Sequence, residues 1–407
     1  MWSWWGLQPL AFWSPLVRLP AGSWSADAVS LPQQNAAAGG TWVQLPRQHG
    51  ICSVPLRREP GLTSCAAEPR QAVVITSLGA GAWRVGNGLI ELDVSSAGLL
   101  ALRDRDGRDQ LSSSLQLERY RDRDEFWDAW DLAADYRSQP LGVLCTDSLE
   151  WLDQGPLVAH LVLRRQLGAS CMRLDLRLKA DTPWLELICG IDWRQTHELL
   201  RLELPLATPA VRIAADTSGG VIERPAAPMT AREQARWEVP VISWFASQSA
   251  APGGGMAVLL DGPQGVDWSS DRLGISLLRG PTWPDPSADQ GWHRQRLALM
   301  PFAGSWSDAG VSQAAIAFRE PGWCADLPAE QRQWFPSLPR SLTPVGLERR
   351  ADGCLLKLLN LGSARCRWTP GAGWRVRREA DSVAASAVVI TPGELVSLVV
   401  DLSLIHI

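Results

Sequence analysis

Carboxylates interleaved with tryptophans are the side chains of this chain whose types and spacing suit chemistry on a sugar. The densest group lies in the run DEFWDAWDLAADYRSQPL, residues 124–141, and comprises Trp127, Asp128, Trp130, Asp131 and Asp135. Aromatic rings stack on the C–H faces of a pyranose, and carboxylates accept its hydroxyl protons. The run therefore predicts a sugar-contacting or domain-joining surface. The alternative, which the residue types alone favour, is an irregular loop whose tryptophans plug a sandwich core, because tryptophan is usually largely buried.

Paired carboxylates are a second feature, because glycoside hydrolysis needs an acid and a nucleophile or base across one bond. The best local pairs are Asp128 with Asp131 and Asp285 with Asp289, and both pairs lie in Trp-rich stretches. Such pairs are common on protein surfaces. The pairing alone therefore does not predict a catalytic couple.

A third group lies in PDPSADQGWH, residues 284–293, where Asp285, Asp289 and His293 combine ligand types that suit zinc or manganese. The prolines at the start of this segment oppose the helix that would bring the three side chains to one face. A loop stabilised by Asx-type hydrogen bonds is the interpretation we favour. We predict no metal site in this chain.

The elements that must position these residues are strands. Apolar and polar residues alternate with period two, most clearly over residues 172–179, MRLDLRLK. Further strands are expected at Leu185–Trp193, Val211–Ala215, Met256–Leu260, Leu273–Leu278 and Leu297–Met300. Helical periodicity is scarce, with two turns expected over Thr230–Trp237. The pattern predicts an all-β chain.

The composition of the chain argues against some classes of binding partner. The net charge of −4 and the pI near 5.8 argue against nucleic acid, which needs a concentrated basic face. The opening twenty residues are apolar but lack the basic start of a signal peptide, and Pro9 and Pro15 make them a poor membrane helix. The eight cysteines are scattered, with no CxxC motif. We therefore expect no nucleic-acid or membrane partner and a cytoplasmic location.

The chain divides into zones of different composition. Residues 1–75 are rich in proline and glycine and predict a small β domain, whereas residues 76–325 carry the long strands and the dense motifs. A Pro-rich linker is expected over residues 326–344, followed by a small β-sandwich over residues 345–401. The last six residues, 402–407 (LSLIHI), resemble a translated sequencing adapter and are expected to lie outside the fold.

Several stretches, taken in order, resemble the C-terminal half of family 38 α-mannosidases. They are DEFWDAWDLAADY, residues 181–206, GGVIERP, ARWEVP, and residues 276–306. The last is the most specific, with its run of LLR, PDP, AD-G-H and a closing P-x-x-G-x-W. The resemblance covers residues 76–325 densely and extends weakly to the opening LQPLAFWSPLVRLP. Gln8 stands where the family usually has Asn, and Phe302 where it usually has His.

The resemblance implies a galactose-mutarotase-like super-sandwich with smaller flanking β-sandwich domains, and retaining, zinc-dependent hydrolysis of α-mannosides. In that family the Asp nucleophile and the Asp/His zinc ligands belong to an N-terminal barrel and an adjoining helical bundle. This chain has no stretch that resembles the barrel and no His-x-Asp pair. We therefore expect a fragment that is inactive alone, with no catalytic residue and no zinc of its own. Its expected partners are the barrel and bundle of the same enzyme and a mannose-containing oligosaccharide.

The candidates for facing the substrate or the cleft are Asp128, Trp130 and Asp131, followed by Asp285, Asp289 and His293. The alternative function is a stand-alone carbohydrate-binding or mutarotase-like module. A mutarotase needs a His and a Glu converging on the sugar ring, whereas the histidines here are scattered, and we interpret His160 and His197 as satisfied and partly buried. The sequence contains no GxSxG, P-loop, HExxH or strand-linked GxGxxG motif. Esterase, nucleotide-binding and zinc-protease functions therefore have no support.

Overall fold

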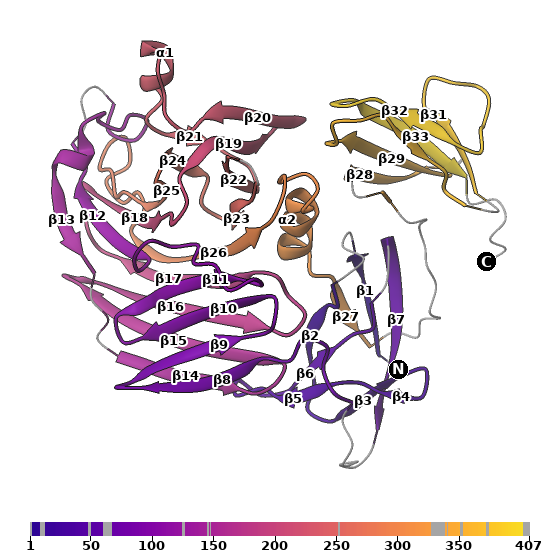
Figure 1. Ribbon diagram of the computed structural model, residues 1–407, viewed down its shortest axis with the longest axis horizontal. Helices are drawn as coiled ribbons and strands as arrows, with labels where there is room; N and C mark the ends of the chain where they lie inside the picture. Colours follow the sequence, from indigo (N-terminus) through magenta and orange to yellow (C-terminus); the bar gives the residue numbers. More distant parts are fainter. Residues whose placement is uncertain are drawn as a thin grey trace.

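The computed structural model describes a chain built almost entirely of antiparallel strands (Figure 1). The described residues are 2–8, 13–47, 50–59, 67–123, 127–144, 146, 148–250, 253–326, 338, 339, 341–350, 353–371 and 374–401. The all-β prediction is confirmed.

A nine-stranded sheet forms the largest layer of the molecule. In spatial order its strands are β14 (Ser148–Gln154), β15 (Val158–Leu167), β16 (Ser170–Lys179), β17 (Leu185–Trp193), β26 (Gly291–Phe302), β23 (Gly255–Asp261), β22 (Trp244–Ser249), β19 (Ala210–Thr217) and β20 (Gly220–Pro225). All its neighbouring strands are antiparallel, and the longest ladder pairs Val158–Leu167 with Ser170–Lys179.

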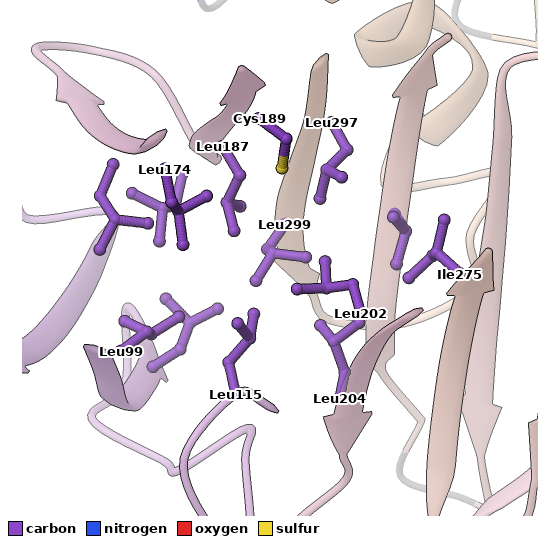
Figure 2. Packing of buried hydrophobic residues seen from close by; sticks show 14 of the residues in the cluster. Leu99, Leu115, Leu174, Leu187, Cys189, Leu202, Leu204, Ile275, Leu297 and Leu299 are labelled. Atoms are coloured by element: carbon purple, nitrogen blue, oxygen red, sulfur yellow. The ribbon is translucent and has the colours of Figure 1, made fainter. Parts of the chain in front are cut away.

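Two further sheets pack against the same hydrophobic core as the nine-stranded sheet. The six-stranded sheet has the order β13 (Pro140–Val143), β12 (Gln116–Arg121), β18 (Glu198–Pro205), β25 (Arg272–Leu278), β24 (Gly265–Ser269) and β21 (Val239–Pro240). The four-stranded sheet has the order β11 (Gly98–Asp104), β10 (Ile90–Ser95), β9 (Ala82–Gly86) and β8 (Val74–Gly79). Figure 2 shows Leu187 and Leu299 of the large sheet beside Leu202 and Leu204 of β18, with Leu99 of β11 close by.

The N-terminal part of the chain forms a smaller pair of sheets with its own core. The first contains β27 (Trp323–Ala325), β1 (Trp2–Gln8), β7 (Gly50–Glu59), β3 (Ser23–Ala26) and β4 (Val29–Ser30), in that order. The second contains β2 (Leu16–Leu19), β6 (Thr41–Gln44) and β5 (Gln33–Asn35). Trp4, Trp24 and Val54 fill the core between them. Strand β27 comes from far along the sequence and pairs with β1.

The C-terminal sheets stand apart at the upper right of Figure 1, in yellow. One has the order β28 (Leu342–Arg350), β29 (Gly353–Asn360), β33 (Leu395–Asp401) and β31 (Arg375–Arg378), and the other pairs β30 (Cys366–Trp368) with β32 (Val388–Ile390). Trp368, Leu358 and Leu398 lie in a separate core there. Most of the predicted linker (residues 327–337 and 340) and the segment 402–407 lie outside the described residues.

The helical segments are short. The 3₁₀ turn η1 covers Tyr136–Ser138, and α1 covers Ala231–Gln234, where Thr230 and Glu233 form a capping box. The helix expected over Thr230–Trp237 is therefore real but ends after one turn. Helix α2 (Val311–Arg319) is not predicted by the sequence pattern, because it has nine residues and begins after Gly310 with no side-chain cap. No helix in the described part of the chain has the length and hydrophobicity needed to span a membrane.

Period-two alternation places the strands well because each strand buries one face more deeply than the other. The predicted strand Leu185–Trp193 coincides with β17, and Met172, Leu174, Leu176 and Leu178 all point into the shared core. In β18 the same alternation sends Leu200, Leu202 and Leu204 to the core. It sends Arg201 and Glu203 to the opposite face, where the candidate site is built.

Candidate functional site

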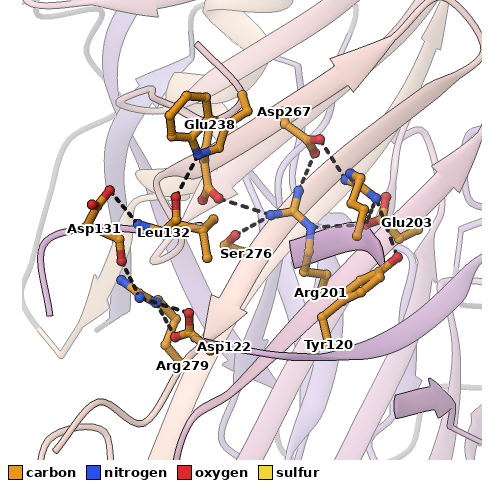
Figure 3. A network of polar contacts seen from close by, with 12 residues as sticks. Tyr120, Asp122, Asp131, Leu132, Arg201, Glu203, Glu238, Asp267, Ser276 and Arg279 are labelled. Atoms are coloured by element: carbon orange, nitrogen blue, oxygen red, sulfur yellow. Dashed lines mark hydrogen bonds and ion pairs between the residues drawn. The ribbon is translucent and has the colours of Figure 1, made fainter. Parts of the chain in front are cut away.

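The Trp/Asp loop, defined here as residues 127–135, lies between β12 and β13 and covers the outer face of the six-stranded sheet. This face carries charged residues that are nevertheless buried (Figure 3). The Arg201 side chain is fully buried, and its Nη2 donates to Asp267. Its Nε lies 3.0 Å from Oε1 of Glu203, and its Nη1 lies 3.2 Å from Oε2 of Glu238. A buried guanidinium is tolerated only when its donors are paired in this way.

The residues directly after the Trp/Asp loop are bound to this buried network of charged side chains. Arg137 of η1 reaches Oδ2 of Asp267 at 2.6 Å and Oε1 of Glu203 at 3.2 Å. The Tyr136 ring is buried against Arg201, whose guanidinium carbon lies 5.4 Å from the ring centroid. Burial opposes ionisation of Asp267, but its arginine neighbours, Arg201 first, outweigh burial and lower its pKa to about 2.

Arg279, at the end of β25, joins the Trp/Asp loop to the sheet. Its Nε and Nη2 lie 2.7 and 3.0 Å from the two carboxylate oxygens of Asp122, which is buried. The same guanidinium donates to the main-chain carbonyls of Asp128, Ala129 and Asp131. Burial raises the pKa of Asp122, although Arg279 opposes that shift. A single side chain thus binds three carbonyl groups within four consecutive residues of the loop backbone.

Asp128 holds the second loop of the site, the β25–β26 loop (residues 279–290). Its Oδ2 accepts the main-chain N–H of Thr282 at 2.7 Å and of Trp283 at 3.0 Å, and the Thr282 hydroxyl at 3.3 Å. His197 lies beside both residues, with Nδ1 3.6 Å from Asp128 Oδ1 and Nε2 3.1 Å from Thr282 Oγ1. Asp128 is 5% exposed. Burial opposes its ionisation, but the main-chain donors and His197 outweigh burial and lower its pKa.

Asp289, near the end of the same loop, binds the backbone at the start of the loop. This residue has a left-handed backbone (φ 61°), and its Oδ2 accepts the N–H groups of Arg279 at 3.1 Å and Gly280 at 3.0 Å. The His293 ring nitrogen Nε2 lies 2.7 Å from the Asp289 carbonyl oxygen. Asp128 and Asp289 therefore secure two successive parts of one loop through its backbone amides.

The remaining predicted carboxylates make short-range contacts. Asp285 is exposed and accepts the N–H and hydroxyl of Ser287 at 2.9 and 2.7 Å, the Asx-type arrangement. Asp131 is half-buried and accepts the N–H of Leu132 at 3.0 Å. Among the residues that the structure describes, no group of three or more His, Cys, Asp or Glu side chains is placed to hold a metal ion. The possible metal ligands of the 284–293 segment, Asp285, Asp289 and His293, instead make hydrogen bonds with the β25–β26 loop.

His160 lies away from this site, on β15. It is buried, with Nε2 2.5 Å from Asp175 Oδ1 and Nδ1 3.5 Å from Asp153 Oδ2. The interpretation of His160 as a satisfied, buried histidine is confirmed. His197 is likewise paired, with its side chain 38% exposed.

Three tryptophans form an exposed cluster over these anchored loops, and we refer to them as the aromatic platform. Trp127, Trp130 and Trp283 are 57%, 68% and 52% exposed. Their ring centroids lie 5.4 to 6.5 Å apart. The interpretation that the tryptophans of the loop plug a sandwich core is therefore wrong for Trp127 and Trp130, because buried charged groups rather than rings anchor the loop. Sequence reasoning left Trp283 out of the candidates, since its partners lie about 150 residues away and no local pattern marks them.

The sequence of this chain is similar to that of known glycosidases. Residues 85–287 match the family model described as "Glycosyl hydrolases family 38 C-terminal domain". The chain is 28% identical over 320 residues to alpha-mannosidase 2C1 of Homo sapiens, covering 76% of this chain and 30% of that protein. It is 26% identical over 208 residues to alpha-mannosidase G of Dictyostelium discoideum, covering 50% and 19%. The chain thus spans less than a third of the length of either relative.

A solved structure shares the fold. An alpha-mannosidase from Enterococcus faecalis superposes with a TM-score of 0.73 at 12% identity, covering 98% of this chain and 55% of that one. At this identity the likeness concerns the fold alone. It extends over nearly the whole chain, beyond the residues matched by the family model.

Proposed function

Because this chain belongs to glycoside hydrolase family 38 through its C-terminal domain, we propose that it is the C-terminal part of an α-mannosidase. The proposed enzyme hydrolyses terminal α-D-mannosyl residues of a mannose-containing oligosaccharide with retention. The names of the sequence relatives support this choice of substrate. We also propose a cytoplasmic location and no nucleic-acid or membrane partner.

In this proposal the reacting groups lie in another part of the enzyme. An N-terminal barrel and its helical bundle supply the nucleophile and the zinc ligands, and this chain supplies neither. Retaining hydrolysis uses two carboxyl groups about 5–5.5 Å apart across the scissile bond. The carboxylates of Asp128 and Asp289 are instead committed to backbone amides. The described residues offer no group of three or more His, Cys, Asp or Glu side chains that could hold zinc, so the zinc of the proposed enzyme is assigned to the barrel and bundle.

The role proposed for this chain is to wall and support the active-site cleft. Trp130, Asp131, Asp285, Asp289 and His293 are assigned to the surface that faces the cleft or the catalytic part. Asp128, expected on the same surface, is buried and is assigned to the support beneath it. The observation that carries this assignment is the aromatic platform, which stays exposed above loops that are fixed by Arg279 and Asp128. Exposed rings on a rigid base are typical of a surface that meets a ligand or another domain.

The finer architecture is part of the same proposal. We assign the shared core of the nine-, six- and four-stranded sheets to a galactose-mutarotase-like super-sandwich over residues 76–325. The flanking β domains would cover residues 1–75 together with β27 (Trp323–Ala325), which pairs with β1, and the residues from Leu342, where β28 begins, to Asp401. The linker expected at 326–344 is therefore shorter and ends before Leu342. Separate hydrophobic cores in the N-terminal and C-terminal parts support this division.

The division of labour is tested by an activity assay on an aryl α-mannoside. The purified 407-residue chain is assayed alone, with and without added zinc, and its bound metal is measured. We expect no turnover, because loss of a nucleophile costs several orders of magnitude in rate. Mixing the chain with a separately expressed barrel half of a full-length relative should restore activity, whereas heat-unfolded chain should not. Zinc-dependent turnover by the chain alone, near that of the full-length relative, would overturn the proposal.

A further inference from the structure

We propose that the aromatic platform binds a pyranose ring, so that Trp127, Trp130 and Trp283 form a sugar subsite contributed by this chain. The inference rests on the proposed function for the identity of the sugar, an α-mannoside. It goes further by naming the binding groups, including Trp283, and by assigning binding to the chain itself.

The composition of the surface favours a sugar over a protein partner. In the two loops, residues 127–135 and 279–290, the large hydrophobic side chains that are exposed are Trp127, Trp130 and Trp283, with no aliphatic residue among them. Protein interfaces combine aromatic anchors with aliphatic neighbours in a closely packed core. Rings that are followed along the chain by the carboxylates of Asp131 and Asp285 suit a ligand that has both C–H faces and hydroxyl protons.

The geometry of the rings leaves faces open in two directions. The planes of Trp127 and Trp283 are inclined by 32°, whereas Trp130 stands at 77° to the first and 72° to the second. In such an arrangement no ring fully covers the face of another. One sugar can therefore stack on one ring face while its edge contacts the perpendicular ring.

The platform is pre-organised by groups beneath it. Within the Trp/Asp loop, the carbonyl of Trp127 accepts the N–H of Trp130 at 3.1 Å and of Asp131 at 2.8 Å. Arg279 binds the loop carbonyls and Asp128 binds the N–H of Trp283, so side-chain hydrogen bonds join the two loops directly. Binding then costs little ordering of the protein, which is the condition under which a small contact area gives measurable affinity.

The test is ligand-observed saturation-transfer NMR on the purified 407-residue chain with an α-linked mannotriose. Saturating the indole protons should transfer magnetisation to the ring C–H protons of the sugar in a saturable manner. Trp130→Ala and Trp283→Ala should each raise Kd about tenfold, the loss of about 1.4 kcal/mol typical of an aromatic contact at the centre of a binding site. The matched control is Trp323→Ala, because Trp323 is 56% exposed but lies on β27 in the N-terminal sheet. Its Kd should be unchanged.

Two results would overturn the inference. One is the absence of saturable transfer at millimolar mannotriose in a chain that is folded by circular dichroism. The other is equal binding by the wild type and both platform variants. In that second case, loss of physical association between the Trp130→Ala chain and the catalytic part would show that the platform docks protein, while the proposed function stands. If even the wild-type chain restores no activity, the proposed function fails independently of the sugar result.

Discussion

Strand β1 and the Trp/Asp loop are both rich in tryptophan, but they place its side chains in opposite ways. In β1, the run WSWW lies in a ladder with β7, and Trp4 opposite Val54 is fully buried. In the Trp/Asp loop, Trp127 and Trp130 are more than half exposed. The ladder fixes which side chains of β1 turn inward, because period two sends alternate residues to one face. The loop has no ladder, so its side chains are directed by whatever binds its backbone.

In the Trp/Asp loop, buried polar groups bind the backbone and thereby set the direction of the side chains. Arg279 binds the loop carbonyls from below, and Asp128 reaches inward to the amides of Thr282 and Trp283. Charged groups are usually exposed and aromatic rings usually buried, whereas here the charged groups are buried and the rings are exposed. Placing charge inside and rings in water costs stability unless the rings meet a partner. The difference between the two regions therefore separates tryptophans that build the fold from tryptophans that are available for function.

The largest expected effect separates these two kinds of tryptophan directly. Trp4→Ala should lower the free energy of unfolding by about 3–5 kcal/mol, because it removes one of the two buried tryptophans of the N-terminal core and leaves a cavity. Trp130→Ala should change it by less than about 0.5 kcal/mol, since the ring is mostly in water. Urea denaturation followed by circular dichroism measures both. Equal destabilisation by the two variants would break the comparison.

The second prediction concerns the buried charge that covers the six-stranded sheet beneath the Trp/Asp loop. Asp267 has a folded pKa of about 2, below its ordinary value of 3.8. A lowered folded pKa gives stability that is complete above the ordinary pKa and is lost as the pH falls through the folded value. Asp267 should therefore contribute about 2 kcal/mol that disappears between about pH 4 and pH 2.

The check is the unfolding free energy as a function of pH for the wild type and Asp267→Asn. The variant starts less stable at neutral pH because it breaks a buried ionic network. Its loss on acidification should be smaller than that of the wild type by about 2 kcal/mol. The control Asp285→Asn changes an exposed carboxylate and should leave the acid slope nearly as it was. Parallel acid curves for the wild type and Asp267→Asn would show that the network does not hold the loop electrostatically.

Much of the fold is predictable from local pattern. Strand β17 coincides with the predicted Leu185–Trp193, because alternate residues of that stretch form its buried face. Helix α2 is missed, since nine residues without a capping side chain give a weak signal. The pairing of β27 with β1 is missed for another reason. It joins residues more than 300 positions apart, and alternation carries no information about partners.

Of the candidate site, the sequence predicts which segments contribute residues but not how those residues are arranged. The sequence points to the Trp/Asp run and to the 284–293 segment, and the structure brings the two loops together through Arg279 and Asp128. The local sequence does not reveal that the Asp128 carboxylate faces inward. The two N–H groups that donate to this carboxylate, those of Thr282 and Trp283, lie 154 and 155 residues away. Nor does local pattern reveal the exposure of Trp283, which depends on that contact. Residue type and spacing identify chemistry, whereas the direction of each side chain is set by long-range hydrogen bonds.

The smallest expected effects separate the two carboxylates of the Trp/Asp loop. Sequence alone suggests that Asp128→Ala and Asp131→Ala both leave the melting temperature nearly unchanged in a complete relative. The structure predicts a difference. Asp128→Ala should cost about 1–3 kcal/mol, because it leaves two main-chain N–H groups of the β25–β26 loop without their acceptor. Asp131→Ala should cost less than about 0.5 kcal/mol, since the one hydrogen bond that the structure describes for its side chain is to the adjacent amide.

Enzyme kinetics on the same pair distinguish positioning from direct contact. If Asp128 acts through Trp283, Asp128→Asn should recover much of the stability of the wild type, because the amide oxygen still accepts the two N–H groups. Its kcat/KM should then recover with it, through KM rather than kcat, since a platform that binds remote sugar contributes equally to the ground state and the transition state. A fall in kcat in Asp128→Asn at unchanged stability would instead mean that the carboxylate charge itself acts on the reacting sugar. That result would move Asp128 from the support of the aromatic platform to the chemistry.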